Sequence, residues 1–234
     1  MKIAFCGDSF VVDTTDKSWP GLLSKEYTAE ILCKGISGLS LYHAYERMMG
    51  NITEADYIIF CITDPSRLSN PFKLPITINQ GMDKNAFIEI QDDKRYSHSH
   101  GILPSVFNYK ELQTAVKYYY KMLYDDSHME TTHRGLLREI ESVVKKYNKK
   151  CIFLKCFSES FPDYIPENVV WGNLYLYEDI SMKEPNFDSN TISKDERKNH
   201  LNDKNNYNMY LFLKDIIDKD DFTPREIKME EYFK

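Results

Sequence analysis

Ser9 is the residue of this chain best placed to act as a nucleophile. It ends the stretch Gly7-Asp8-Ser9, which directly follows the apolar run Ile3 to Cys6. A serine hydroxyl is a weak nucleophile at neutral pH, so it needs a histidine to accept its proton and donors to stabilise the oxyanion. Small residues after a buried strand are also compatible with a plain turn. The rest of the sequence must therefore supply a base and hydrogen-bond donors.

Small and polar residues also follow the next two apolar runs. The stretch "KGISGLS" contains Gly35 and Gly38, where a glycine lets a backbone N–H approach a ligand closely. The stretch "IIFCITDPSR" ends its run in a hydroxyl and a carboxylate, Thr63 and Asp64. Open parallel sheets build their sites at the carboxyl ends of the strands, so these residues predict one polar rim. A helix-entry turn at Gly38 and a strand-ending turn at Asp64 are the plainer interpretations.

The base must come from one of six histidines. His200 is the best candidate, because it lies in a polar loop just before the last amphipathic segment, which can return a loop to the rim. We interpret the other five as structural or exposed. His98 and His100 have a spacing that suits a metal on an extended segment, but no carboxylate or cysteine partner is evident. We expect no metal and no other cofactor.

Apolar runs alternate with segments of helical spacing, and this alternation predicts a parallel sheet covered by helices. Ser18 and Ser40 are predicted helix N-caps, and Gly50 is a predicted helix end. Two helices are expected between 109 and 147, broken near Asp125, and a last helix over 208–218. A weaker signal for a strand lies within 168–181. The predicted central strands are Ile3 to Cys6, Ala29 to Cys33, Tyr57 to Thr63 and Cys151 to Phe157.

We expect a single domain over residues 1–234, since no linker or internal repeat divides the chain. Residues 66–108 contain scattered prolines without a sustained period, which indicates an insertion or a lid after the third strand. The tyrosine-rich stretch "KYYYKMLY" within the following helices suits either core packing or a stacking surface for a sugar or base. Residues 220–234 form a charged tail.

The ordered blocks resemble the SGNH hydrolases, the GDSL-type esterases and lipases. They are Gly-Asp-Ser after the first strand, a glycine after the second, a polar residue with Asp after the third, and a late His before the last helix. The resemblance includes "SWPGLL" and "GISGLS". It implies a flavodoxin-like three-layer α/β/α sandwich. It also implies that Ser9 attacks an ester, that His200 is the base, and that Ser9, Gly38 and Thr63 form the oxyanion hole.

Two departures from the family pattern affect these roles. The third block usually reads Gly-x-Asn-Asp, whereas Thr63 stands at the asparagine position and can donate one hydrogen bond. The family usually has Asp three residues before the His, where this chain has Arg197. Asp195 can act as the triad acid only if the loop takes a different path, so a Ser-His dyad assisted by a backbone carbonyl stays open. Arg197, Asp8 and Asp64 are candidates for binding substrate, an arginine suiting an anionic group.

The leading hypothesis is a serine hydrolase that acts on a small or carbohydrate O-acyl ester through a Ser9 acyl-enzyme. The alternatives are a binding or structural protein that has lost hydrolysis and an enzyme that transfers the group to another acceptor. A net charge of −6 argues against a nucleic-acid partner, and no apolar run approaches the ~20 residues that span a bilayer. Five cysteines without CxxC spacing predict buried thiols in a reducing compartment, so we expect a cytoplasmic protein. The oligomeric state stays open.

Overall fold

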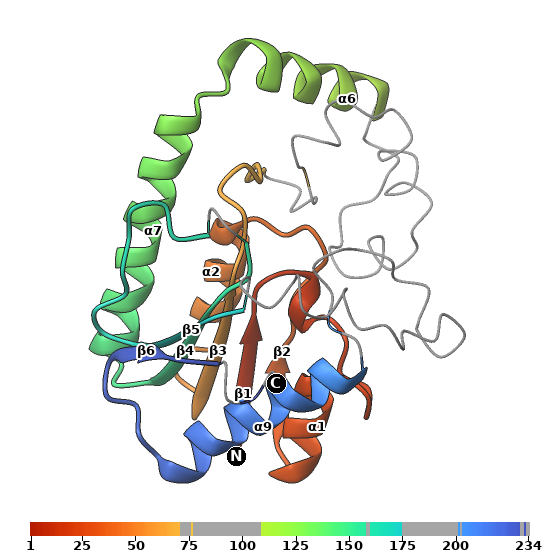
Figure 1. The fold of residues 1–234 in the computed structure, drawn as a ribbon. Coiled ribbons are helices and arrows are strands. Elements are labelled where there is room, and N and C mark those ends of the chain that lie inside the picture. Colours follow the sequence, from red (N-terminus) through yellow and green to blue (C-terminus); the bar gives the residue numbers. More distant parts are fainter. Residues whose placement is uncertain are drawn as a thin grey trace.

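A six-stranded, fully parallel sheet forms the centre of the protein (Figure 1). The computed structural model describes residues 1–70, 76, 109–157, 160–174, 201, 203–229 and 232. The strand order is β2-β1-β3-β4-β5-β6. The strands are β1 (Lys2–Cys6), β2 (Glu30–Cys33), β3 (Tyr57–Ile62), β4 (Lys150–Lys155), β5 (Val170–Asn173) and β6 (Arg225–Ile227). The four predicted strands are confirmed, with ends that differ by one or two residues.

Helices cover both faces of the sheet. Helices α1 (Trp19–Glu26) and α9 (Asp203–Lys219) lie on one face, and α2 (Leu41–Met49) and α7 (Asp126–Lys146) lie on the other. Successive residues of a strand point to opposite faces, so β1 sends Phe5 against Trp19 and Ala4 toward α2. Strands buried on both faces have continuous apolar sequences, which explains why β1 and β3 could be recognised. The predicted flavodoxin-like three-layer α/β/α sandwich is confirmed.

The predicted capping residues lie at the start of α1 and at both ends of α2. The side chain of Ser18 accepts a hydrogen bond from the N–H of Gly21 at the start of α1. Ser40 accepts one from the N–H of His43 at the start of α2, and Gly50 follows the last residue of that helix. These bonds satisfy backbone donors that a helix leaves without an internal partner. Both helices lead from the carboxyl edge of the sheet back to its amino edge.

The region after the insertion contains an element that the sequence analysis does not predict. Helix α6 (Tyr109–Tyr118) continues into one π-helical segment, η3 (Tyr119–Leu123), before α7 begins. Asp125 caps α7 by accepting a hydrogen bond of 2.7 Å from the N–H of His128. The break between the two helices therefore lies near Asp125, where the sequence predicts it. The tyrosine-rich stretch forms the end of α6 and the π-helical segment η3.

The charged tail contributes the sixth strand. β6 pairs with β5 from Val170↔Arg225 to Gly172↔Ile227. Beyond it Met229 is buried, and the hydroxyl of Tyr232 donates a hydrogen bond of 2.8 Å to Asp215 of α9.

Two further expectations concern the cysteines and the possibility of a membrane-spanning helix. All five cysteines are buried and unpaired, as the sequence predicts. None of the helices in the described part of the chain combines the length and the apolar character needed to cross a membrane.

Candidate functional site

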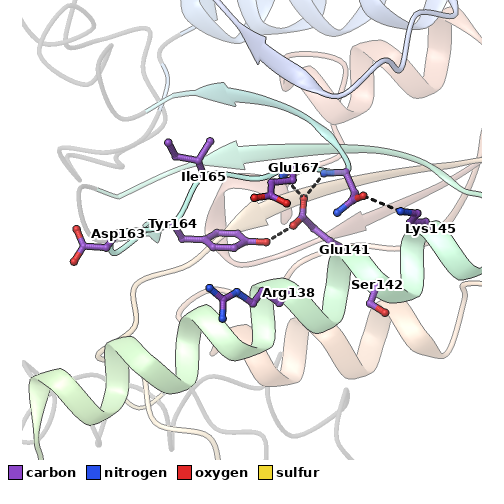
Figure 2. A pocket seen from close by; sticks show the side chains of 9 residues that line it. Arg138, Glu141, Ser142, Lys145, Asp163, Tyr164, Ile165 and Glu167 are labelled. Atoms are coloured by element: carbon purple, nitrogen blue, oxygen red, sulfur yellow. Dashed lines mark hydrogen bonds between the residues drawn. The ribbon is translucent and has the colours of Figure 1, made fainter.

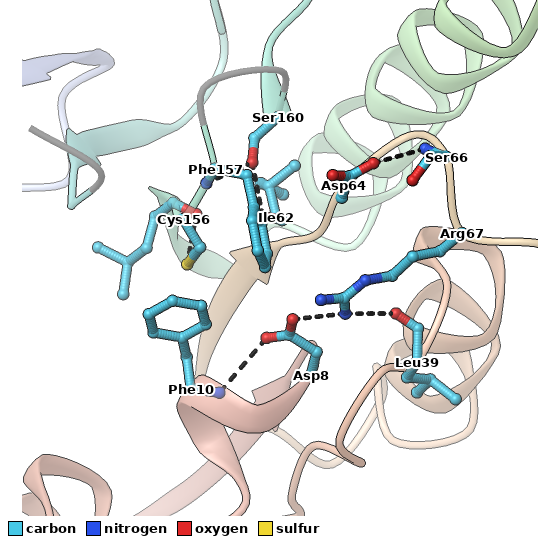
Figure 3. Close-up of polar contacts among 11 residues, drawn as sticks. Asp8, Phe10, Leu39, Ile62, Asp64, Ser66, Arg67, Cys156, Phe157 and Ser160 are labelled. Carbon is cyan, nitrogen blue, oxygen red and sulfur yellow. Dashed lines mark hydrogen bonds and ion pairs between the residues drawn. The ribbon is translucent and has the colours of Figure 1, made fainter. Parts of the chain in front are cut away.

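The ends of β1 and β3 lie side by side and bring Ser9 and Thr63 to the same edge of the sheet. Cys6 pairs with Phe60 in the register of these two strands. Ser9 comes three residues after Cys6, and Thr63 comes three residues after Phe60. Both segments therefore leave the sheet at its carboxyl edge, where the sequence predicts the polar rim. Figure 3 shows this rim from close by.

The turn before Ser9 requires a glycine. Gly7 has a φ of +136°, and a Cβ atom on it would lie 2.6 Å from the carbonyl oxygen of Cys61. Ser9 then begins a short 3-10 helix, η1 (Ser9–Val11), for which Asp8 is the N-cap. Ser9 is half-buried, and its hydroxyl forms no hydrogen bond with any residue that the structure describes. The hydroxyl is thus held on a fixed turn and is not engaged by any described residue.

A buried ion pair lies directly beside Ser9. Asp8 is fully buried, and its Oδ1 accepts a hydrogen bond of 3.3 Å from the N–H of Phe10. Its Oδ2 lies 2.5 Å from Nη1 of Arg67, which also donates to the carbonyl of Leu39 at 3.2 Å. The guanidinium carbon of Arg67 lies 4.8 Å from the centre of the Phe157 ring (Figure 3). Protein donors therefore engage both oxygens of the Asp8 carboxylate.

The loop after β2 packs against the Ser9 turn. The N–H of Gly35 donates to the carbonyl of Val11 at 3.0 Å, and the N–H of Ile36 donates to Gly7 at 3.3 Å. A Cβ atom on Gly35 would lie 2.2 Å from the carbonyl oxygen of Asp8, so no other residue fits this approach. Gly38 follows with a φ of +74°, a left-handed conformation that favours glycine. The loop that carries the predicted backbone donor is thus held against the turn that carries Ser9.

Thr63 has an unusual environment for a hydroxyl. Its side chain is fully buried, and Oγ1 has no hydrogen-bond partner among the residues that the structure describes. Buried polar atoms almost always have a partner, because removing one from water without compensation is costly. A hydroxyl in this condition can donate to a group that arrives during a reaction.

The first residues after β3 are fixed above the rim. Asp64 Oδ1 accepts a hydrogen bond of 2.6 Å from the N–H of Ser66, which turns the chain back. The hydroxyl of Tyr120 in η3 donates to the carbonyl of Ser66 at 2.7 Å. The hydroxyls of Ser69 and Ser40 lie 3.0 Å apart, which fastens the same segment to the start of α2. Residues 71–75 and 77–108 of the predicted insertion lie outside the described residues.

His133 is close to the rim but has a structural partner. It lies buried in α7, and its Nε2 donates to the carbonyl of Ser160 at 2.9 Å. The hydroxyl of Ser160 donates in turn to the carbonyl of Ile62 at the end of β3. Burial lowers the pKa of His133 to about 4, and the bond to Ser160 opposes this only in part. Within the described residues, no group of three or more His, Cys, Asp or Glu side chains is arranged to hold a metal ion.

His200, Asp195 and Arg197 lie outside the described residues, so their roles stay predictions. The helix that follows His200 is described, and its direction is informative. α9 leads into the amino end of β6, so it begins on the carboxyl side of the sheet. Near its start, Asn206 accepts a hydrogen bond of 3.1 Å from the N–H of Trp19, the first residue of α1. The start of α9 therefore lies on the same side of the sheet as Ser9.

Arg67 is the rim residue that the sequence analysis misses. The sequence places it within the expected insertion 66–108, whereas the turn at Asp64 returns it over the sheet. The sequence offers one signal, a short polar turn "TDPSR" directly after a buried strand. That signal does not reveal the partners of Arg67, because Asp8 and Leu39 come from other parts of the chain.

A separate cavity lies beside the C-terminal half of α7 (Figure 2). It has a volume of about 540 Å³ and is bordered by α7 and residues 163–168. Buried Glu141 accepts hydrogen bonds from the N–H groups of Glu167 and Asn168, both at 2.9 Å, and from the hydroxyl of Tyr164. Glu141 lies about two helical turns beyond His133, toward the end of α7 that leads into β4. Its contacts hold the segment before β5, away from the rim.

Comparisons with known proteins give little information about the function of this site. No protein family matches the chain, and no curated protein does. Ten chains of solved structures match, among them the crystal structure of an acetyl xylan esterase, AlAXEase. That match has a TM-score of 0.31 and 14% sequence identity, and it covers 66% of this chain and 57% of the other. A likeness of this size carries no argument about activity, so the function must be argued from the site.

Proposed function

We propose that this protein is a serine ester hydrolase of the SGNH type, acting through an acyl-enzyme on Ser9. The observation that carries the proposal is the placement of two residues at one edge of the sheet: Ser9, on a glycine-dependent turn, and Thr63, directly after the adjacent strand β3. The buried Thr63 hydroxyl has no hydrogen-bond partner among the described residues. A nucleophile needs donors for the oxyanion that it creates. An unsatisfied buried hydroxyl beside a serine at the carboxyl edge of a parallel sheet is suited to that role.

In the proposed reaction the Oγ atom of Ser9 attacks the ester carbonyl while His200 accepts its proton. The oxyanion of the tetrahedral intermediate accepts hydrogen bonds from the backbone N–H groups of Ser9 and Gly38 and from the hydroxyl of Thr63. The carbon–oxygen bond to the alcohol then breaks, and His200 returns the proton to the departing alcohol. Water, deprotonated by His200, attacks the acyl-enzyme carbonyl; the bond from the acyl carbon to Ser9 Oγ breaks, His200 returns the proton to Oγ, and the carboxylic acid leaves. Asp195 or a backbone carbonyl orients His200.

The proposed substrate is a small or carbohydrate O-acyl ester. Three half-buried tyrosines, Tyr119, Tyr120 and Tyr124, have ring centres 5.3–6.3 Å apart at the end of α6. Tyr120 is bonded to the segment that carries Arg67, so this aromatic cluster adjoins the rim. Aromatic faces next to polar groups suit a sugar, and Asp64 and Arg197 are proposed to bind its polar groups.

Hydrolysis of p-nitrophenyl acetate and of acetylated oligosaccharides by the full chain tests the proposal. The wild-type protein should release acetate, and Ser9→Ala and His200→Ala should each reduce kcat by at least about 10³-fold. Both variants should keep the far-UV circular dichroism of the wild type. A well-folded wild-type protein that releases no acetate from either substrate would rule the proposal out.

A second candidate is a protein that keeps the fold and binds the ester or transfers its acyl group elsewhere. Thr63 favours it, because one hydroxyl donor replaces the amide of the family pattern and can leave the oxyanion less stabilised. Acyl transfer predicts a product whose yield rises with an added sugar or alcohol. Binding without turnover predicts saturable ligand binding that Ser9→Ala leaves intact.

A further inference from the structure

Arg67 joins the ends of four neighbouring strands. It belongs to the segment after β3, and its Nη1 donates both to Asp8, after β1, and to Leu39, after β2. Its guanidinium lies over the ring of Phe157, which follows β4. The arginine side chain is only 9% exposed, so these contacts are made away from water. One side chain thus connects the nucleophile turn to the loop that contains Gly38.

The charge of Arg67 also matters for the reaction. The Asp8 carboxylate is fully buried and adjoins Ser9 in the sequence. Attack by Ser9 creates a second negative charge, and charges of the same sign repel strongly where water is excluded. The environments of two buried thiols, Cys61 and Cys156, also include Asp8, and burial raises the pKa of both, which leaves them uncharged. Within the part of the chain that the structure describes, Arg67 is the cation that pairs with Asp8.

We propose that Arg67 is a positioning residue of the proposed hydrolase, which it serves without touching the substrate. It holds the Ser9 turn and the Gly38 loop in their relative places, and it neutralises the Asp8 carboxylate beside the developing oxyanion. The inference rests on the proposed function. Because Nη1 is engaged by internal acceptors and the side chain is only 9% exposed, we expect Arg67 to contribute equally to the reaction of neutral and anionic esters.

The rate of covalent labelling by an uncharged fluorophosphonate measures this role directly. Arg67→Met should label at Ser9 about 10²-fold more slowly than the wild type, in line with the loss of one electrostatic element of an oxyanion site. Arg67→Lys, which keeps the charge but not the planar fork, should lie between them. Asp8→Asn combined with Arg67→Met should label at least about tenfold faster than Arg67→Met alone, because the uncompensated carboxylate is gone.

Arg138→Met is the matched control. Arg138 lies at the separate cavity on α7, 6.0 Å from the centre of the Tyr164 ring, so its loss should leave labelling unchanged. All rates are measured below the unfolding temperature of each variant and expressed per folded molecule. With p-nitrophenyl acetate, Arg67→Met should lower kcat and leave KM within about twofold. If Arg67→Met does not fold, the labelling rates of Arg67→Lys and Asp8→Asn are compared with that of the wild type instead.

Three results would overturn the inference. Labelling of folded Arg67→Met at the wild-type rate would reduce Arg67 to a structural residue. A defect confined to anionic esters, seen as a higher KM, would make it a substrate-binding residue. A wild-type protein that is not labelled at Ser9 would overturn the proposed function and this inference with it, whereas the first two results leave the proposed function intact.

Discussion

Replacing Thr63 by valine should stabilise the fold and slow the reaction at the same time. The Thr63 hydroxyl is fully buried and lacks a partner within the described residues. An unsatisfied buried hydroxyl costs about 1–3 kcal/mol of stability, and valine has nearly the same shape without that polar atom. We therefore expect the free energy of unfolding to rise by about 1–2 kcal/mol. For a chain of this size that raises Tm by roughly 2–8 °C.

The same change removes one proposed donor to the oxyanion. Loss of such a donor typically lowers kcat by about 10²- to 10³-fold. Urea unfolding gives the stability of Thr63→Val, and hydrolysis of p-nitrophenyl acetate gives its kcat. Thr63→Ser is the matched control, because it keeps the hydroxyl and removes only a methyl group. It should lose about 1 kcal/mol of stability and keep kcat within about tenfold of the wild type.

A rise in the free energy of unfolding together with a fall in kcat is expected of Thr63→Val if the folded protein leaves this hydroxyl without a partner and the reaction uses it as a donor. A destabilised Thr63→Val would show that the hydroxyl has a structural partner after all. A stabilised Thr63→Val with full activity would show that the hydroxyl plays no part in the oxyanion hole. Either result would refute the reasoning about Thr63.

Three further predictions concern the scaffold. Gly35→Ala should lower the free energy of unfolding by about 1–3 kcal/mol, because its Cβ would lie 2.2 Å from the Asp8 carbonyl oxygen. Gly135→Ala on α7 meets nothing within 4 Å and should raise it by about 0.5–1 kcal/mol, as urea unfolding can show. Because burial lowers the pKa of His133 to about 4, the unfolded chain takes up a proton near pH 6.5 while the folded protein does not. Stability should thus fall by roughly 3 kcal/mol between pH 6.5 and 4, and His133→Gln should lose that part of the pH dependence.

The fold was largely predictable because its strongest signals are local. β1, β3 and β4 are buried on both faces and therefore have continuous apolar sequences. Ser18 and Ser40 form cap bonds within three residues of themselves. β6 was not predictable, because Arg225-Glu226-Ile227 is a polar edge segment that becomes a strand only by pairing with β5.

The candidate site also has a part that the sequence predicts and a part that it does not. Ser9, Gly38 and Thr63 could be placed on one rim because chain order and parallel pairing determine where strands end. The buried ion pair of Asp8 and Arg67 could not be foreseen, because 59 residues separate its partners. Its formation depends on a turn at Asp64 and on the close approach of the Gly35 loop, and neither is encoded by residue type alone.

The most direct test of the central claim is the site of covalent modification of the full chain by a fluorophosphonate. Intact-mass measurement followed by peptide mapping shows how many adducts form and on which residue. We expect one adduct per chain, located on Ser9 and absent from Ser9→Ala. A folded wild-type protein that forms no adduct, or forms it on another residue, would contradict the assignment of Ser9 as the nucleophile.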